Sequence, residues 1–157
     1  MVIEKNISLK HLNSFGMHVL AKEYTSIESK QVLAKVLNTN SSNLLVLGGG
    51  SNMLLTKDVD ALVLHINIKG IEVISVFENN VKIRVSAGEN WHEFVCWCLQ
   101  KNYGGVENLS LIPGNVGTAP IQNIGAYGVE LKEIFISCEG MNIETQELRT
   151  FCKEDCN

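Results

Sequence analysis

The chain has 157 residues, of which 45% are hydrophobic, and carries a formal net charge of −4. This length and composition suffice for one folded domain or for two small lobes, and with arginine only at Arg84 and Arg149 there is no basic stripe for nucleic acid. No apolar run approaches the ~18 residues that cross a membrane, and residues 1–6 do not read as a signal peptide. We therefore expect a cytoplasmic protein without nucleic-acid or membrane partners.

The N-terminal part predicts a strand, a helix and a second strand. Residues 23–27 and 43–47 are the two strands, and residues 29–39 are the helix between them. The helix is predicted because apolar residues recur along it at helical spacing: Val32, Leu33, Val36 and Leu37. If the two strands pair in parallel, the Gly48–Gly50 turn lies at the carboxyl end of a strand, where such units bind ligands.

The next segments alternate between strands and a helix. Val- and Ile-rich stretches predict strands at 61–66, 71–77 and 81–87, the last two forming a hairpin. Residues 91–102 are expected to form a helix that is capped by Asn90. A second hairpin is expected from 133–143 and 146–150, with its turn at Glu144-Thr145. This order predicts an α+β fold with a βαβ lobe at 1–66 and a second lobe at 67–157.

Two glycine-rich segments are the candidate ligand-binding features. The first, Gly48-Gly49-Gly50-Ser51-Asn52, follows a predicted strand; the second, within 105–130, has five glycines and no Lys or Arg. Glycines let a ligand approach the backbone, and two amide-rich turns suit a dinucleotide with two phosphates. A turn used only for chain geometry is the alternative for Gly48–Gly50, and Ser51 and Asn52 can equally close a local turn.

Four motifs in this order resemble the UDP-N-acetylenolpyruvoylglucosamine reductase family. They are Asn13-Ser14-Phe15-Gly16, Gly48-Gly49-Gly50-Ser51-Asn52, Ala87-Gly88-Glu89-Asn90-Trp91-His92, and the segment from Ile112-Pro113-Gly114 to Pro120-Ile121-Gln122-Asn123-Ile124-Gly125-Ala126-Tyr127-Gly128. The resemblance implies an FAD enzyme of peptidoglycan precursor synthesis. It implies that NADPH supplies the hydride that reduces the enolpyruvyl group of a nucleotide sugar, UDP-N-acetylglucosamine enolpyruvate, to give UDP-N-acetylmuramate.

The resemblance also implies a fold and a set of cofactor contacts. The fold is a two-lobed FAD-binding domain of the vanillyl-alcohol-oxidase type, with the cofactor between the lobes. The expected FAD-binding residues are Gly48, Gly49, Gly50, Ser51, Asn52, Met53, Pro113, Gly114, Gly117, Thr118, Asn123, Ile124, Gly125, Ala126 and Tyr127. From the sequence alone, an amide such as Gln122 or Asn123 could equally meet a flavin edge, adenine or a backbone group.

The family's catalytic segment is expected beyond Asn157, so no catalytic residue is predicted in this chain. We expect the chain alone to be inactive, as a fragment or a truncated product. Two alternatives stay open at this point. The chain could be a non-catalytic flavin-binding fragment, or it could come from another oxidoreductase of the same FAD-binding fold.

The cysteines and histidines do not form a recognisable catalytic or metal-binding pattern. Five cysteines are an odd number, which favours free thiols. Cys96 and Cys98 lie on different faces of their helix, and Cys152 and Cys156 lack further ligands nearby, so we expect no metal. His92 is expected to be a structural or surface residue.

Overall fold

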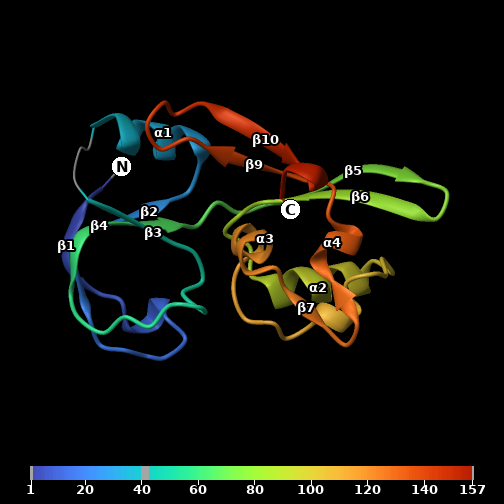
Figure 1. The fold of residues 1–157 in the computed structure, drawn as a ribbon, viewed down its shortest axis with the longest axis horizontal. Coiled ribbons are helices and arrows are strands. Elements are labelled where there is room, and N and C mark those ends of the chain that lie inside the picture. Colours follow the sequence, from blue (N-terminus) through green and yellow to red (C-terminus); the bar gives the residue numbers. More distant parts are fainter. Residues whose placement is uncertain (1, 40–42, 157) are drawn as a thin grey trace.

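The computed structural model describes residues 2–39 and 43–156 (Figure 1). The strands are β1 (Glu4–Ser8), β2 (Leu20–Ile27), β3 (Leu44–Leu47), β4 (Val59–Ile66), β5 (Ile71–Phe77), β6 (Asn80–Val85), β7 (Gly125–Ala126), β8 (Val129–Glu130), β9 (Ser137–Met141) and β10 (Leu148–Cys152). The α-helices are α1 (Lys30–Thr39), α2 (Trp91–Gln100), α3 (Ala119–Gln122) and α4 (Leu131–Ile134). Short 3₁₀ turns occur at Lys10–Leu12, Glu107–Leu109, Val116–Thr118 and Lys153–Cys156.

The N-terminal elements build one four-stranded sheet in the order β1-β2-β4-β3. β2 and β3 each pair in parallel with β4, and β1 runs antiparallel to β2. A direct pairing of the two strands that flank α1 is therefore wrong, because β4 lies between them. The central position of β4 fits its continuous apolar run. Leu62, Val63 and Leu64 are fully buried, which requires cover on both faces of the sheet.

Both faces of this sheet are covered. On one face, Leu62 and Leu64 of β4 pack with Val36 and Leu37 of α1, as the helical spacing predicts. On the other face, Val63 packs in a second cluster with Leu9, Val19, Ala21, Leu47 and Leu55. The segment between β1 and β2 supplies Leu9 and Val19 to this cluster, so the N-terminal loop is part of the core.

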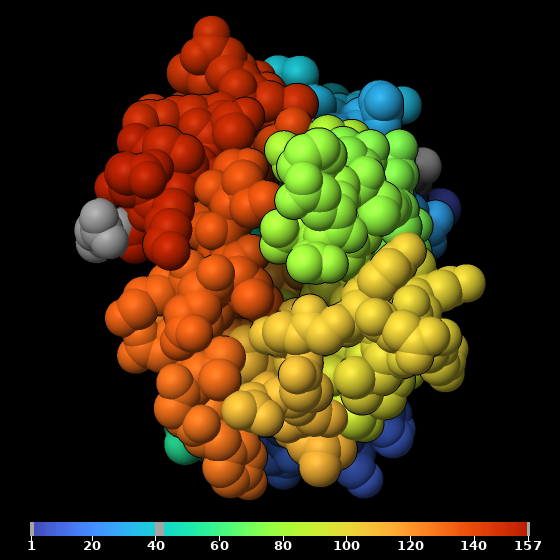
Figure 2. Space-filling view, turned by 90° about the vertical axis from the view of Figure 1, so that its right-hand side faces the viewer, coloured from blue at the N-terminus to red at the C-terminus, as the bar shows by residue number. Residues whose placement is uncertain are grey.

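The second core lies between α2 and the elements around it (Figure 1). α2 begins after Asn90, whose side chain accepts a hydrogen bond from the Glu93 backbone N–H at 3.0 Å, as the sequence predicts. Its face contributes Trp91, Phe94, Val95 and Cys98, against which Ile83 and Val85 of β6 pack. Figure 2 shows the β5–β6 hairpin in green on the same face as the yellow segment after α2 and the orange segment that includes α4.

Two parts of the predicted element order are wrong. The strand β1 was not predicted, since Glu4–Ser8 has no clear apolar alternation and is mostly exposed. The strand expected over 133–143 starts late, because Leu131–Ile134 forms α4 with a capping box between Glu130 and Glu133. The following hairpin of β9 and β10 is confirmed, and Asn142 closes its turn by accepting hydrogen bonds from Glu144 and Thr145.

The mixed architecture confirms the α+β class. The four-stranded sheet uses residues 4–66, and the chain passes through 67–70 into β5. The β9–β10 hairpin lies against α1. There Glu139 forms an ion pair with Lys30, and Met141 packs on the cluster that contains Leu62 and Leu64. The division into lobes at 1–66 and 67–157 stays a prediction.

Candidate functional site

The two glycine-rich turns, far apart in the sequence, contact each other. The hydroxyl of Ser51 donates a hydrogen bond to the Pro113 carbonyl oxygen at 3.2 Å. A Cβ added at Gly49 would lie 3.0 Å from the Gly114 Cα, and one at Gly48 would lie 2.5 Å from the Thr118 methyl group. Such spacing leaves no room for side chains. The two turns therefore lie against each other and form one continuous surface.

Gly50 connects this surface to the N-terminal loop. Its φ is +60°, and a Cβ at this position would lie only 2.0 Å from the Leu12 carbonyl oxygen. The Gly50 carbonyl accepts a hydrogen bond from the Ser14 N–H at 3.1 Å. Asn13, which precedes Ser14, is buried and bonds to Leu9 and Met17 through both ends of its amide. The Asn13–Gly16 motif therefore packs against the Gly48–Gly50 turn and holds it in place.

Residues 87–92, which end in the first turn of α2, bind the second glycine-rich turn. Gly114 accepts from the Trp91 N–H at 3.0 Å, and Gly117 donates to the Ala87 carbonyl at 2.9 Å. A Cβ at Gly117 would lie 2.5 Å from the Ala87 Cβ, so protein packing alone requires glycine there. None of the residues in this 87–92 segment was predicted as part of the site, although its motif carries the family resemblance.

The turn after β3 presents unused hydrogen-bond donors. Within residues 2–39 and 43–156, the backbone N–H groups of Gly49, Ser51 and Asn52 have no acceptor. The Asn52 side chain is exposed and has no partner among the same residues. An orphaned set of amides at the carboxyl end of a parallel strand is suited to an anion such as phosphate. Met53, which follows, packs instead on the sheet cluster.

The remaining predicted contacts follow α3. Asn123 ends this helix in the left-handed conformation, with φ 44° and ψ 56°. Its neighbour Ile124 is buried in the α2 core, and its carbonyl accepts from the Leu131 N–H at 2.9 Å. Tyr127 and Gly128, both with positive φ, form the two-residue turn between β7 and β8. The Tyr127 side chain is 89% exposed.

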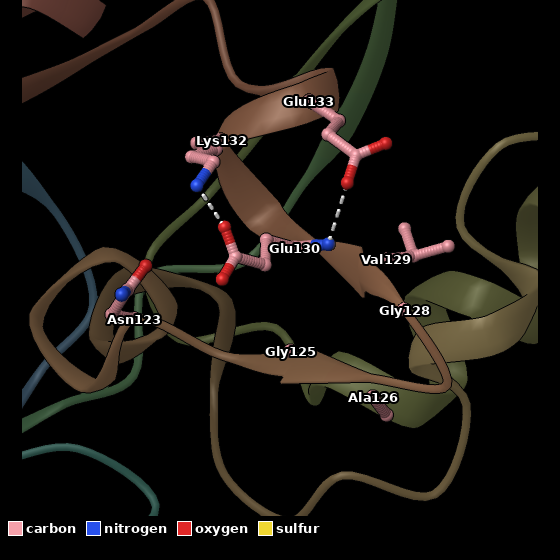
Figure 3. A pocket seen from close by; sticks show the side chains of 8 residues that line it. All are labelled: Asn123, Gly125, Ala126, Gly128, Val129, Glu130, Lys132 and Glu133. Atoms are coloured by element: carbon pink, nitrogen blue, oxygen red, sulfur yellow. Dashed lines mark hydrogen bonds and ion pairs between the residues drawn. The ribbon is translucent and has the colours of Figure 1, made fainter.

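An open hollow of about 530 Å³ lies beside this segment (Figure 3). It is lined by Asn123, Gly125, Ala126, Gly128, Val129, Glu130, Lys132 and Glu133. Figure 3 shows Lys132 paired with the Glu130 carboxylate, and the Glu133 carboxylate accepts from the Glu130 N–H at 3.1 Å. The nearby Glu130 carboxylate raises the pKa of Lys132, which stays a cation.

The residues that the structure describes contain neither a metal-binding cluster nor a membrane-spanning helix. Among residues 2–39 and 43–156, no group of three or more His, Cys, Asp or Glu side chains could hold a metal ion. In the same ranges, no helix is long and apolar enough to cross a membrane.

The mixed fold, with a glycine-rich turn at the carboxyl end of a parallel strand, is typical of a nucleotide-binding domain, and comparison with known proteins specifies the family. The sequence model of the FAD binding domain family matches residues 22–147, so the chain belongs to this family and its cofactor is FAD. Within it, the chain is 52% identical to the UDP-N-acetylenolpyruvoylglucosamine reductase of Flavobacterium johnsoniae, over 100% of this chain and 47% of that protein.

Further relatives carry the same name. The reductase of Amoebophilus asiaticus is 48% identical over 99% of this chain, and that of Pseudomonas putida is 45% identical over 98%. The chain spans about half the length of the curated relatives it matches. The crystal structure of the Thermus caldophilus UDP-N-acetylenolpyruvylglucosamine reductase has a similar fold, with a TM-score of 0.76, 23% identity, and coverage of 99% of this chain and 54% of that one.

Proposed function

We propose that this chain is the FAD-binding portion of an NADPH-dependent reductase that converts UDP-N-acetylglucosamine enolpyruvate to UDP-N-acetylmuramate. The observation that carries the proposal is the 52% identity to a protein of that name, which extends over the whole chain. The proposed substrate is therefore a nucleotide sugar. We place the reaction in the cytoplasm because it draws on NADPH and a nucleotide sugar, and it would serve peptidoglycan synthesis.

The turn after β3 is proposed to bind the pyrophosphate of FAD. Among residues 2–39 and 43–156, the amides of Gly49, Ser51 and Asn52 meet no acceptor, and Gly114 and Thr118 lie against this turn. Backbone amides are the donors to expect, because Arg84 is paired with Glu72 and Arg149 lies over the Phe151 ring. Backbone donors at fixed positions bind an anion without the entropy loss of long side chains.

The segment after α3 is proposed to lie along the rest of the cofactor. Asn123, Gly125 and Ala126 line the open hollow, and Tyr127 stands exposed at its edge. Small residues at 125 and 126 leave space for a flat ring, and the Asn123 amide can both donate and accept. Ile124 would contribute through its backbone, because its side chain belongs to the core.

When bound, FAD supplies hydride transfer, for which the protein itself has no group. The residues of this chain would hold the cofactor's phosphates on the glycine-rich turns and orient its ring against the β7–β8 segment. They would also exclude water from the face that packs on the protein. Gly50 and Gly117 would act indirectly, because the space next to each is filled by protein.

Titration of the purified chain with FAD, followed by flavin fluorescence, tests this proposal. In the Asn52→Asp variant, a carboxylate of nearly the same size lies beside the proposed pyrophosphate, and we expect roughly tenfold weaker binding, or about 1.4 kcal/mol. The matched control is Asn79→Asp, which makes the same change in the exposed turn of the β5–β6 hairpin. Absence of FAD binding to the unaltered chain, or equal affinity of both variants, would contradict the proposed site.

A further inference from the structure

Leu111 has a backbone conformation that leucine rarely adopts. Its φ is +63°, in the left-handed region, and it lies just before the Pro113–Thr118 turn. The Leu111 side chain is 76% exposed, so burial does not hold it in place. Another contact must stabilise this conformation, because strained residues persist only where the surroundings fix them.

His92 provides that contact from the first turn of α2. Its Nδ1 lies 3.1 Å from the Ser110 hydroxyl and 3.3 Å from the Leu111 backbone nitrogen. A backbone N–H can only donate, so Nδ1 accepts and the ring proton lies on Nε2. Nε2 lies 3.7 Å from the Cys96 sulfur, one helical turn further on, and that sulfur can accept a weak hydrogen bond from Nε2–H. The ring is thereby fixed with its acceptor toward Leu111.

The same helix holds the turn at two points. Trp91 donates its backbone N–H to the Gly114 carbonyl, and the next residue, His92, bonds to Ser110 and Leu111. The turn between these points carries Pro113, whose carbonyl accepts from Ser51. Release of Leu111 would therefore move the second glycine-rich turn away from the first.

We infer that His92 is a positioning residue for the cofactor: its Nδ1 acceptor holds the strained Ser110–Leu111 segment so that both glycine-rich turns meet in one phosphate-binding surface. This role rests on the proposed function, and it goes beyond the structural or surface role expected from the sequence. His92 itself does not contact the cofactor. Its effect on affinity passes through Leu111 and the Pro113–Thr118 turn.

A pair of substitutions separates this role from general support of the helix. In His92→Asn, the amide oxygen takes the place of Nδ1, whereas in His92→Gln the amide lies one bond further out, near Nε2. Gln is the better helix former of the two, so loss of helix stability alone would harm the Asn variant more. The positioning role predicts the opposite order.

The first measurement is amide hydrogen exchange at Leu111, observed by NMR in the FAD-free chain. We expect exchange at least about tenfold faster in His92→Gln than in the unaltered chain, and within about threefold of it in His92→Asn. The Tyr103 amide, which donates to Cys98 at the other end of α2, is the internal control and should not change. Unchanged Leu111 exchange in His92→Gln would overturn the inference.

The second measurement is FAD affinity of the same three proteins. We expect about tenfold weaker binding for His92→Gln and near-normal binding for His92→Asn, the conservative rescue. Equal affinities, or weaker binding by the Asn variant, would overturn the link to the cofactor. If the unaltered chain binds no FAD, the proposed function fails, while the exchange at Leu111 still decides whether His92 holds this segment.

Discussion

The Tyr24 hydroxyl lies 2.9 Å from Nδ1 of His65, joining two strands beneath the first glycine-rich turn. His65 pairs in register with Leu47, the last residue of β3 before that turn. Burial lowers the pKa of His65 below its ordinary 6.5, and nearby Lys69 lowers it further. Burial also raises the pKa of Tyr24, so both groups stay neutral near pH 7.

The lowered pKa of His65 predicts a loss of stability in mild acid. As the pH falls below 6.5, the unfolded chain protonates His65 but the folded chain resists, so the free energy of unfolding decreases until the folded pKa is passed. One proton limits this slope to about 1.4 kcal/mol per pH unit. Urea unfolding at about pH 7.5 and about pH 5.5 measures the loss.

Two variants make this prediction specific. His65→Gln should lose less stability than the unaltered chain over the same pH range, because it cannot take up the proton. His11→Gln, at an exposed position, should lose as much as the unaltered chain. The same pH-dependent loss in all three proteins would show that His65 is not responsible.

Two glycines with the same backbone conformation predict very different substitution costs. Gly50 and Gly16 have φ values of +60° and +62°. An alanine Cβ at 50 would lie 2.0 Å from the Leu12 carbonyl oxygen, whereas one at 16 would meet nothing within 4 Å. Gly16→Ala should cost only the left-handed conformation, roughly 1–2 kcal/mol. Gly50→Ala should cost more than ~4 kcal/mol and abolish folding in a marginally stable chain.

Melting of the FAD-free variants by circular dichroism tests this contrast. The comparison also shows why Gly50 and Gly117 are poor positions for testing a phosphate contact, since each substitution disturbs the fold before any ligand binds. Similar melting temperatures for Gly16→Ala and Gly50→Ala would mean that the N-terminal loop does not pack on the turn.

FAD should stabilise the folded chain by mass action. A cofactor that binds only the folded state adds about 2.7 kcal/mol at a hundredfold excess over Kd, which corresponds to a rise in Tm of roughly 5–10 °C for a chain of this size. Riboflavin, which lacks both phosphates, should raise Tm much less. If riboflavin and FAD give the same rise at equal concentration, the amides of Gly49, Ser51 and Asn52 do not bind a pyrophosphate.

Reductase turnover is not expected from the 157-residue chain alone. It aligns with 47% of the length of the Flavobacterium johnsoniae reductase. Within the hollow, the carboxylate of Glu130 pairs with Lys132 and that of Glu133 accepts from the Glu130 N–H, so both already have partners in the chain. We expect FAD binding without substrate-dependent NADPH oxidation, which can be followed by NADPH absorbance with purified protein of verified mass. Oxidation that depends on UDP-N-acetylglucosamine enolpyruvate would show that the chain itself contains the catalytic groups.

Local sequence patterns predicted the local elements. Helical spacing located α1 and α2, Asn90 marked the start of α2, and the Val- and Ile-rich runs located the β5–β6 hairpin. The short α4 was missed because its signal, the capping pair Glu130 and Glu133, spans one turn within an otherwise strand-like run.

The order of the strands and the contacts between distant segments could not be predicted from local patterns. Nothing in residues 59–66 indicates that β4 inserts between β2 and β3, because strand order depends on pairing between distant segments. The sequence predicts a site made of two amide-rich turns. It does not predict that Ser51 contacts Pro113 or that Gly117 packs on Ala87. The sequence predicts only a structural or surface role for His92, since its partners Ser110 and Leu111 lie 18 and 19 residues away.

The contact between Ser51 and Pro113, 62 residues apart, can form only when the intervening chain closes into a long loop. Ser14 must meet Gly50 and Ala87 must meet Gly117 before the surface is complete, so its formation carries the entropy of closing several long loops. During synthesis from the N-terminus, the first turn emerges long before its partner. We therefore expect a nearly folded chain to bind FAD, late in folding, rather than FAD to serve as the nucleus around which the chain folds.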